Sequence, residues 1–322
     1  MLTFHVNYNP TSCDLTIHRY ARQQLKMSLT AWRKFKHTGS IILNGNIALP
    51  GDLLRPGDVL SFDCQVVTKL KPADGLLDIA YEDDSLLIVN KPAGLLVHPT
   101  SNQLEITLAN YVIGHYRKQL EQQAFHPIHR LDRNTSGLIL IAKNPYIQQQ
   151  LSGKFSDCFK HSYLALVQGI LHNSGTIDAP IGRKPGSIIE RIVTSEGQAS
   201  ITEYKVIENF STATLLSLSL LTGRTHQIRV HLAHIGHPLL GDDLYGGNRK
   251  LIARHALHSA EITLVHPMSQ TQLHLKSSLP DDIVQAVNSL AQKLNIESSV
   301  GESIPSRGRF APTEATKWNS HL

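Results

Sequence analysis

The apolar residues of this chain form short runs and alternations that polar, Gly and Pro clusters separate, a pattern typical of mixed helices and strands. The clearest run is Leu138–Ala142, which is apolar throughout. Its length, the polar turn at 134–137 before it and Lys143 after it predict a buried strand. We therefore expect a rigid strand directly after the polar turn.

The first 63 residues predict two short helices followed by a small sheet. The apolar spacing at 15–25 fits one helix, and either Ser28 or Thr30 is a suitable N-cap for the second. The apolar face of this second helix carries Trp32 and Phe35 inward. The pattern then predicts strands at 40–43, 47–49 and 58–62, with a helix stop at Gly39 and a tight turn at Asn44-Gly45.

The remainder of the chain predicts many strands and few helices. The strands are expected at 77–81, 86–89, between Gly94 and Pro99, and at 138–142, 161–171, 188–194, 199–208, 212–221, 256–264 and 272–275. The helices are expected at 104–123, 145–159, 226–235 with Thr225 as N-cap, and 281–294. Because several strands follow one another without crossover helices, the pattern favours an α+β fold with a mixed, largely antiparallel sheet flanked by helices and loops.

Length and composition limit the classes of protein. A chain of 322 residues exceeds the usual size of one domain, so two domains are expected. The sequence has no apolar run of membrane-spanning length and no signal-peptide pattern at its start, which favours a cytoplasmic protein. Cys13, Cys64 and Cys158 are too few and too scattered for a disulfide framework or a metal knuckle, so we interpret them as reduced packing residues.

The positive charge is concentrated near the start of the chain. The formal net charge is +5, and the first 75 residues hold nine Lys and Arg against five Asp. Arg22 and Arg33 lie on the two predicted N-terminal helices and Lys26 between them, forming a basic surface suited to the phosphates of a nucleic acid. The alternative is a solvated basic face that binds nothing.

The polar turn before the central strand carries the candidate chemistry. Asp132 lies between two cations, Arg130 and Arg133. A carboxylate displayed on a loop beside a rigid strand, and kept ionised by guanidiniums, is suited to act as a nucleophile or to stabilise charge. The alternative interpretation is a structural ion pair in a loop.

A second group of polar residues lies around the start of the predicted helix at 226–235. Arg224 stands just outside this helix, His226 lies at its start and Arg229 follows one turn later. The chain has 18 His, and four of them crowd this helix and its exit, but their spacing is not HExxH and no Cys lies nearby. We therefore expect no metal site, and because P-loop, GxGxxG and GxSxG motifs are missing we expect no nucleotide cofactor and no hydrolase elbow.

Three stretches resemble, in this order and with family-like spacing, the RluA-type RNA pseudouridine synthases. They are HRLDRNTSGLILIAK at 129–143, YLALVQG at 163–169 and TGRTHQIRVHLAHIGHPLLGDDLYG at 222–246, and NKPAGLLVHP at 90–99 adds to the match. The N-terminal segment, with ILNGN at 42–46 and LRPGDVLSF at 54–62, resembles the alpha-L RNA-binding fold, although Leu29 stands where relatives often have Arg. Together these matches resemble the RluD-like members of the family, which carry an alpha-L domain before the pseudouridine synthase fold.

The resemblance implies roles for individual residues. Asp132 would be the catalytic carboxylate, Arg229 its basic partner and Tyr163 the aromatic side chain against the target base. Arg130 would fill the gap left by a flipped nucleotide, because the target uridine has to leave its stack. From the strand pattern alone, a Tyr on the buried face of a strand, as Tyr163 is, is most often a core residue. We expect further RNA contacts from a set of cationic side chains: Arg133, Arg224, His226, Arg22, Lys26 and Arg33.

The predicted domains are an alpha-L domain at 14–63, a linker at 64–76, a catalytic domain at 77–297 and a disordered tail at 298–322. The expected partner is RNA, with large-subunit ribosomal RNA favoured and transfer RNA as the alternative substrate. We expect no cofactor, no membrane association and a monomer. Two other hypotheses remain open, a non-catalytic RNA-binding ribosome-assembly factor and a His-based metal hydrolase.

Overall fold

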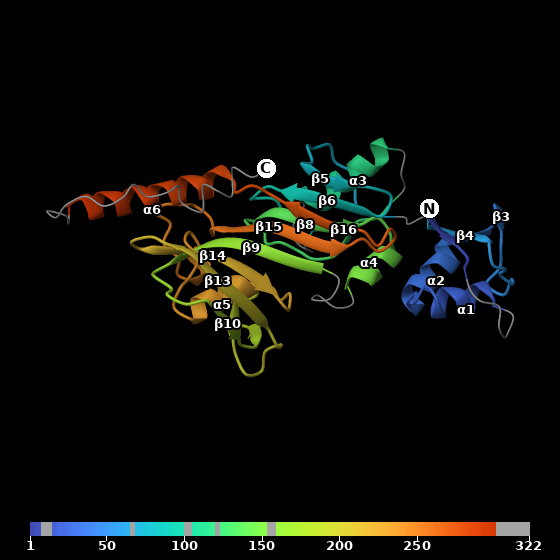
Figure 1. Cartoon of the computed structure of the whole chain (residues 1–322), viewed down its shortest axis with the longest axis horizontal. Coiled ribbons are helices and arrows are strands. Elements are labelled where there is room, and N and C mark those ends of the chain that lie inside the picture. Colours follow the sequence, from blue (N-terminus) through green and yellow to red (C-terminus); the bar gives the residue numbers. More distant parts are fainter. Residues whose placement is uncertain (8–14, 65–67, 100–104, 120–122, 153–158, 301–322) are drawn as a thin grey trace. The chain divides into compact units, whose positions relative to one another are not determined.

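The computed structural model describes residues 1–7, 15–64, 68–99, 105–119, 123–152 and 159–300, shown as a cartoon in Figure 1. The chain divides into two compact units: unit 1 comprises Met1–Val89, His98–His129 and Leu140–Gly153, and unit 2 comprises Asn90–Val97, Arg130–Ile139 and Lys154–Leu322. The predicted domain boundaries at 63 and 77 remain predictions. The interpretation of Cys13 and Cys158 as packing residues falls outside the described residues, as does that of the Cys64 side chain.

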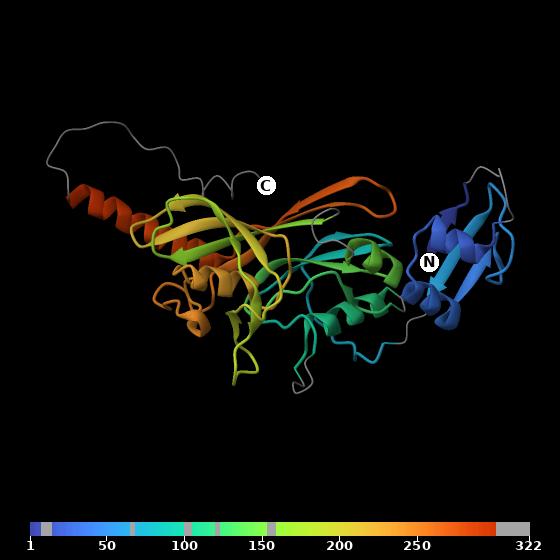
Figure 2. The same cartoon turned by 90° about the horizontal axis from the view of Figure 1, so that it is seen from below.

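The start of unit 1 holds two helices and a small sheet (blue in Figure 2). These elements are α1 (Ile17–Gln23), α2 (Leu29–Thr38), β1 (Leu2–His5), β2 (Gly39–Leu43), β3 (Asn46–Ile47) and β4 (Val59–Cys64). The strand order of this four-stranded sheet, within the described ranges, is β1-β4-β2-β3. Helix α2 contacts β2 and β4, so its apolar face covers the sheet.

Both predicted N-terminal helices form. The Oγ of Ser28 accepts a hydrogen bond from the backbone N–H of Ala31 (3.1 Å), which identifies Ser28 rather than Thr30 as the cap of α2. Trp32 and Phe35 are buried, as the spacing predicts. The small sheet differs from the prediction: β1 is an additional strand, and the strand expected at 47–49 is reduced to β3.

The rest of unit 1 contributes short strands and two helices. These elements are β5 (Ile79–Glu82), β6 (Leu86–Lys91), α3 (Leu108–Lys118), β7 (His126–Pro127), β8 (Ser136–Ala142) and α4 (Pro145–Ser152), and both β6 and β8 have residues in each unit. Helix α3 is shorter than the predicted 104–123, since 105–107 and 119 are not helical. Of the helix predicted at 145–159, α4 confirms 145–152, Phe159 belongs to β9, and 153–158 lie outside the described residues. Every residue of β8 is buried, as its apolar run predicts.

The strand predicted between Gly94 and Pro99 does not form, and this segment of unit 2 turns instead. The Nζ of Lys91 donates hydrogen bonds to the carbonyl oxygens of Pro92 (2.8 Å) and Leu95 (2.9 Å). A lysine inside the turn therefore satisfies the carbonyls that a neighbouring strand would otherwise bind. Sequence periodicity carries no sign of such a long-reaching side chain.

Unit 2 contains most of the large sheet. Its strands are β9 (Phe159–Gln168), β10 (Gly175–Asp178), β11 (Ile181–Arg183), β12 (Arg191–Val193), β13 (Ile201–Asn209), β14 (Ala213–Leu220), β15 (Leu257–Val265) and β16 (Gln272–Lys276). Its helices are α5 (Gln227–His234), the 3-10 helix η1 (Asp243–Tyr245) and α6 (Asp281–Val300). Strands β10 and β11 are absent from the sequence prediction, and β12 is shorter than the predicted 188–194.

The ten-stranded sheet has, among the described residues, the order β10-β13-β14-β9-β15-β8-β6-β5, with β16 beside β15 and β7 beside β8. Strands β13, β14, β9 and β15 are antiparallel neighbours, whereas β15 runs parallel to β8. The sheet is thus mixed and largely antiparallel, and the predicted α+β class is confirmed. Strands β11 and β12 form a separate two-stranded ribbon.

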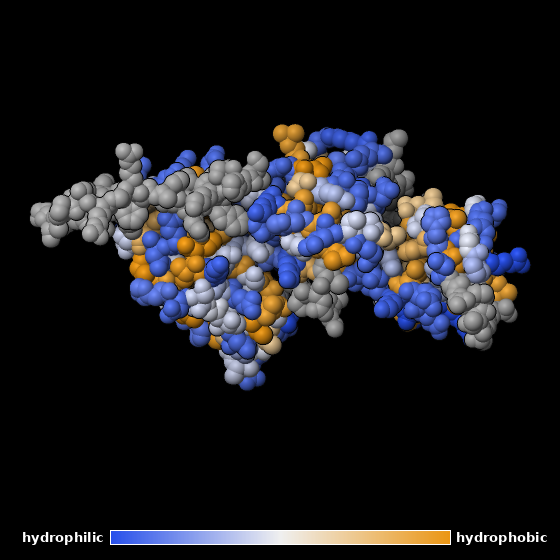
Figure 3. All heavy atoms as spheres, in the orientation of Figure 1, coloured by the Kyte–Doolittle hydropathy of each residue, from blue (hydrophilic) through white to orange (hydrophobic). Residues whose placement is uncertain are grey.

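Helix α6 closes one part of the unit 2 core. Ile283, Val287 and Leu290 of this helix belong to a buried cluster with Leu166 of β9 and Leu215 of β14. The helix continues to Val300, beyond the predicted start of the disordered tail at 298. In the surface view of Figure 3, hydrophobic residues lie in small areas between hydrophilic ones. No helix within the described segments has the length and apolar character needed to span a bilayer.

Candidate active site

Asp132 lies in unit 2, on the loop that leads into β8. Its side chain is 19% exposed, so the carboxylate is partly sheltered and still reachable. The Nη1 of Arg229 donates to the Oδ2 of Asp132 (3.3 Å), and the Nε2 of His226 lies 3.9 Å from the same oxygen. The structure therefore brings together Asp132, Arg229 and His226, three of the predicted site residues.

The backbone of this loop is fixed on both sides of Asp132. The carbonyl of Arg133 accepts hydrogen bonds from the Nζ of Lys91 (3.0 Å) and from the backbone N–H of Gly94 (2.9 Å). The carbonyl of Asn134 accepts one from the Nη1 of Arg254 (2.9 Å). Because these donors come from distant parts of the sequence, the carboxylate is held by tertiary contacts rather than by a local turn alone.

Thr135 and Ser136 tie the loop to the start of β15. The Oγ1 of Thr135 is hydrogen bonded to the Nε2 of His255 (2.8 Å), and the Oγ of Ser136 to the Nδ1 of His258 (3.0 Å). Burial lowers the pKa of His255 and of His258 to about 4, so both rings are neutral near pH 7. The next residue, Gly137, has φ +107°, and a Cβ there would lie 2.2 Å from the carbonyl oxygen of Ser259. This position accepts only glycine.

Arg229 is held by a second carboxylate that the sequence prediction did not include. The Nε and Nη2 of Arg229 donate to the two carboxylate oxygens of Asp242, each at 2.7 Å, and both side chains are buried. Burial acts to lower the pKa of Arg229, but the hydrogen bonds and charges of Asp242 and Asp132 raise it overall. The guanidinium is therefore a permanent cation with only Nη1 directed at Asp132.

Tyr245 contacts both Arg229 and His226, the two neighbours of Asp132. Its ring lies 5.0 Å below the guanidinium carbon of Arg229. Its hydroxyl is hydrogen bonded to the Nδ1 of His226 (2.8 Å) and accepts a hydrogen bond from the backbone N–H of Arg191 (3.0 Å). Both Tyr245 and Asp242 lie within the matched motif at 222–246, but residue type and spacing gave no reason to single them out.

Tyr163 lies in β9, where it pairs with Ser259 of β15 and Leu218 of β14. It is 5% exposed, and its ring centroid lies 4.2 Å from that of His161. Burial and the charge of Asp132 raise the pKa of Tyr163 far above its ordinary value, so the hydroxyl stays protonated. The side chain is thus within the electrostatic reach of Asp132 and is also part of the packed sheet.

The other predicted RNA contacts lie on the surface. Arg130 and Arg224 are exposed, and the Nε of Arg224 donates to the carbonyl of Ala199 (3.3 Å). Arg133 is half-buried. In unit 1, three exposed cations lie on or directly after the N-terminal helices: Arg22, whose Nη1 donates to the carbonyl of Met27, Lys26 and Arg33.

The predicted N-cap of α5 is wrong. The residue before the helix is His226, which adopts the left-handed conformation at φ 57°, and its side chain makes no capping bond. The Oε1 of Gln227 instead accepts hydrogen bonds from the backbone N–H of Arg224 (2.9 Å) and the hydroxyl of Thr222 (2.9 Å). Gln227 thus replaces Thr225 in organising the turn, and the unusual backbone of His226 turns its ring toward Asp132.

His231 of α5 and His237, which follows the helix, are engaged in hydrogen bonds. His231 contacts the hydroxyl of Thr202 and the carbonyl of Ala179, each at 2.9 Å, and the Nδ1 of His237 contacts the carbonyl of Gln168 at 2.9 Å. A search of the described residues finds no group of three or more His, Cys, Asp or Glu placed to hold a metal ion. Hydrogen bonding thus accounts for His231 and His237 in this histidine-rich stretch.

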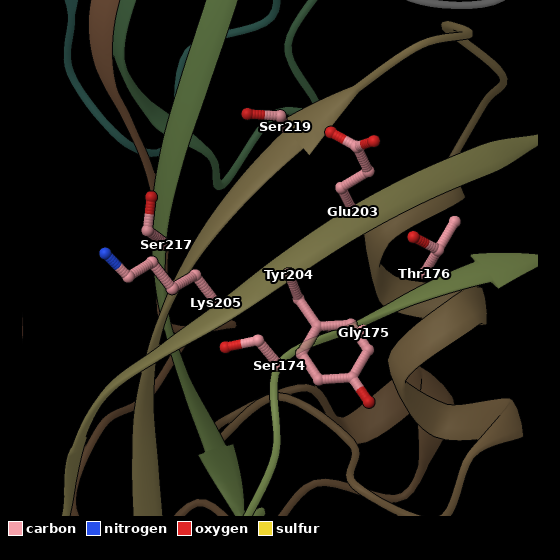
Figure 4. A pocket seen from close by; sticks show the side chains of 8 residues that line it. All are labelled: Ser174, Gly175, Thr176, Glu203, Tyr204, Lys205, Ser217 and Ser219. Carbon is pink, nitrogen blue, oxygen red and sulfur yellow. The ribbon is translucent and has the colours of Figure 1, made fainter.

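A separate hollow of about 600 Å³ lies over β10, β13 and β14 (Figure 4). Glu203, Lys205, Ser217 and Ser219 line it, and its floor is the polar face of the sheet. It includes none of the predicted site residues. The hollow is thus separate from the group of side chains around Asp132.

Comparisons with known proteins show which family this chain is similar to. Residues 85–234 match the family model of RNA pseudouridylate synthase. An uncharacterized RNA pseudouridine synthase of Bacillus subtilis, YjbO, is 42% identical over 213 residues, which cover 66% of this chain and 75% of that protein. The ribosomal large subunit pseudouridine synthase D of Xylella fastidiosa is 34% identical over 281 residues, which cover 82% of this chain and 84% of that protein.

A solved structure shows the same fold. The human RNA pseudouridylate synthase domain containing 1 superposes with a TM-score of 0.53 at 25% identity, covering 72% of this chain and 97% of that chain. The large sheet and the helices around it thus form the pseudouridine synthase fold. The chain belongs to the RluA-type RNA pseudouridine synthases, isomerases that convert uridine in RNA into pseudouridine.

Proposed function

We propose that this enzyme isomerises uridine in large-subunit ribosomal RNA, and that Asp132 is the reacting carboxylate. The observation that carries the proposal is the placement of Asp132: partly exposed, 3.3 Å from the guanidinium of Arg229, on a loop fixed by tertiary hydrogen bonds. A carboxylate held ionised and oriented before the substrate arrives is what nucleophilic or proton-abstracting chemistry requires.

The reaction is balanced without a redox step or an energy source. The bond between N1 of uracil and C1′ of the sugar breaks, the uracil turns while bound, a bond forms between C5 and C1′, and the C5 proton leaves while N1 becomes protonated. Asp132 begins this sequence by attack on the nucleoside or by taking a sugar proton. Both routes need the ionised carboxylate that Arg229 stabilises.

The neighbouring residues have separate roles in the proposal. Tyr163 offers its ring to the uracil, and its protonated hydroxyl is available for the final proton transfer. Arg130 is exposed beside the loop, where its side chain can occupy the space that a flipped nucleotide leaves in the RNA. Flipping costs a few kcal/mol, which favours loops and weak stems as targets.

The choice of ribosomal RNA rests on the relatives. Several of them are named ribosomal large subunit pseudouridine synthase D, in Nitrosomonas europaea at 42% identity and in Xylella fastidiosa at 34%. The exposed cations of α1 and α2 offer a second surface for a large folded RNA. Transfer RNA is the alternative substrate that the experiment has to distinguish.

The test is to map pseudouridine across all RNA, by carbodiimide-resistant stops, in a deletion strain that expresses wild type or Asp132→Asn. We expect the deletion to lose sites in large-subunit ribosomal RNA, wild type to restore them and Asp132→Asn to fail. Asp243→Asn is the matched control, because Asp243 is a nearby exposed acid, and it should restore every site. Lost sites confined to transfer RNA would overturn the substrate, and restoration by Asp132→Asn would overturn the role of Asp132.

A further inference from the structure

The turn at 241–247 places the aromatic side chain of Tyr245 against both Arg229 and His226. Residues 241–247 form a tight turn in which the N–H groups of Tyr245 (3.2 Å) and Gly247 (2.8 Å) both donate to the carbonyl of Asp242. A Cβ at Gly247 would lie 1.8 Å from the carbonyl oxygen of Leu239, so the turn has no room to relax. Tyr245 is therefore presented rigidly to its neighbours.

The hydroxyl of Tyr245 has two neighbours that restrict its proton. It accepts a hydrogen bond from the backbone N–H of Arg191 (3.0 Å), and this donor cannot reverse its role. The second neighbour is the Nδ1 of His226 at 2.8 Å. If the hydroxyl proton points to Nδ1, the ring proton of neutral His226 has to be on Nε2.

The charge of Asp132 favours the same tautomer. The Nε2 of His226 faces the Oδ2 of Asp132 at 3.9 Å. In the Nε2–H tautomer the N–H bond dipole points toward the carboxylate, which is attractive. In the Nδ1–H tautomer the lone pair of Nε2 faces the carboxylate, which is repulsive. Burial lowers the pKa of His226 below its ordinary value of 6.5. The charge of Asp132 acts to raise this pKa and that of Arg229 to lower it, and both effects are smaller than that of burial. The tautomer argument therefore applies to the neutral ring.

We propose that Tyr245 is a positioning residue for the reaction: its hydroxyl fixes His226 as the Nε2–H tautomer facing Asp132, and its ring supports Arg229. His226 then presents a fixed N–H donor beside the reacting carboxylate, available to Asp132 or to an oxygen of the bound nucleoside. The inference rests on the proposed role of Asp132. The inference adds that Tyr245 determines which nitrogen of His226, beside Asp132, carries the proton.

The variant Tyr245→Phe separates the hydroxyl from the ring. It keeps the aromatic ring under Arg229 and removes only the hydrogen bond to His226. We expect kcat to fall about 5- to 30-fold, the effect of one or two kcal/mol, with KM nearly unchanged. In a His226→Gln background the same substitution should change kcat less than about twofold, because the hydroxyl then has no ring to orient. Tyr204→Phe, in the hollow of Figure 4, is the matched control and should retain wild-type kcat.

Nitrogen-15 NMR of the imidazole gives a readout that needs no activity. His226 is assigned by its loss in His226→Gln, and we expect Nε2–H in wild type and a mixture of tautomers in Tyr245→Phe. A wild-type ring protonated on Nδ1, an unchanged tautomer in Tyr245→Phe, or wild-type kcat in that variant would overturn the proposal. If the protein fails to modify ribosomal RNA, the tautomer is still measurable, so the two proposals fail separately.

Discussion

Arg229 serves two carboxylates with different strength. Asp242 takes two donors at 2.7 Å inside the protein, whereas Asp132 receives one donor at 3.3 Å near the surface. The tighter pair is structural and holds the guanidinium in place. The looser pair leaves Asp132 oriented but with lone pairs available for the substrate, which suits a group that has to react.

The first prediction concerns the shape of this cation. Arg229→Lys keeps the positive charge but replaces the planar guanidinium by an ammonium group with one nitrogen. That nitrogen cannot reproduce the hydrogen bonds to both Asp242 and Asp132. We expect kcat to fall on the order of 100-fold, measured as release of the C5 proton from RNA labelled with tritium at that carbon. Arg249→Lys, at an exposed arginine, is the control. A kcat within threefold of wild type would contradict the role given to the guanidinium of Arg229.

The second prediction concerns the buried partner. Asp242→Asn removes the charge that compensates Arg229, and breaking a buried pair from one side costs about 3–5 kcal/mol. We expect the free energy of unfolding in urea to fall by that amount, with loss of activity because the guanidinium is no longer anchored. A variant as stable as wild type would show that Asp242 is dispensable for holding Arg229.

At the scale of elements, the site depends on the loop before β8 and on the start of β15. Both are short, and their contacts link residues about 120 positions apart, as in Thr135 with His255 and Ser136 with His258. The strand β8 supplies the rigid base, and neutral buried histidines supply the hydrogen bonds. Protonation of His255 or His258 should therefore weaken two of the hydrogen bonds that hold the loop.

The third prediction is a pH dependence of stability. Burial lowers the pKa of His255 from 6.5 to about 4, so between these values the unfolded chain binds a proton that the folded chain does not. Stability therefore falls as the pH drops from about 6.5 to about 4. Urea unfolding at a series of pH values should show a shallower slope for His255→Gln, which keeps a hydrogen bond to Thr135 but does not titrate. An identical slope in both proteins would refute this assignment.

The sequence predicts elements that local patterns define and misses those that distant partners define. The apolar run at 138–142 identifies β8, and the paired signals around Asn44-Gly45 locate the N-terminal hairpin. Strand β1 escapes because its few residues gain order only from β4, far along the chain (Leu2 opposite Phe62). The Thr225 cap is wrong because a local rule does not account for Gln227, which reaches back to Thr222.

The candidate site follows the same rule. Asp132 is recognisable because two arginines flank it, and the resemblance to the family singles out Arg229. Asp242, Tyr245 and Lys91 have no such signal in residue type or spacing, and only the folded chain shows what they contact. The side chains that hold the reacting group are therefore harder to predict than the reacting group.

At the scale of the whole molecule, the chain combines a catalytic unit with basic helices that belong to unit 1. The exposed side chains of Lys26 and Arg33 carry no chemistry of their own. We assign them to RNA affinity, because cations that track phosphates release counterions without affecting the reacting centre.

The fourth prediction tests that assignment. In Lys26→Ala/Arg33→Ala we expect KM for ribosomal RNA to rise and the salt dependence of binding to become shallower by about two counterions, with kcat unchanged. Lys276→Ala, which removes a cation paired with Glu261, is the control. If the salt dependence of RNA binding is unchanged, Lys26 and Arg33 belong to a solvated basic face that does not bind RNA.

The parallel pairing of Ser136 and Gly137 with His258 and Ser259 joins segments about 120 residues apart, and this separation affects when the site forms during biosynthesis. While the nascent polypeptide emerges, Asp132 leaves the ribosome 97 residues before Arg229 and still earlier than His255. At about 5–20 residues per second this delay lasts roughly 5–20 seconds. A polypeptide terminated before Arg229 therefore carries Asp132 without the guanidinium that lies 3.3 Å from it in the folded protein.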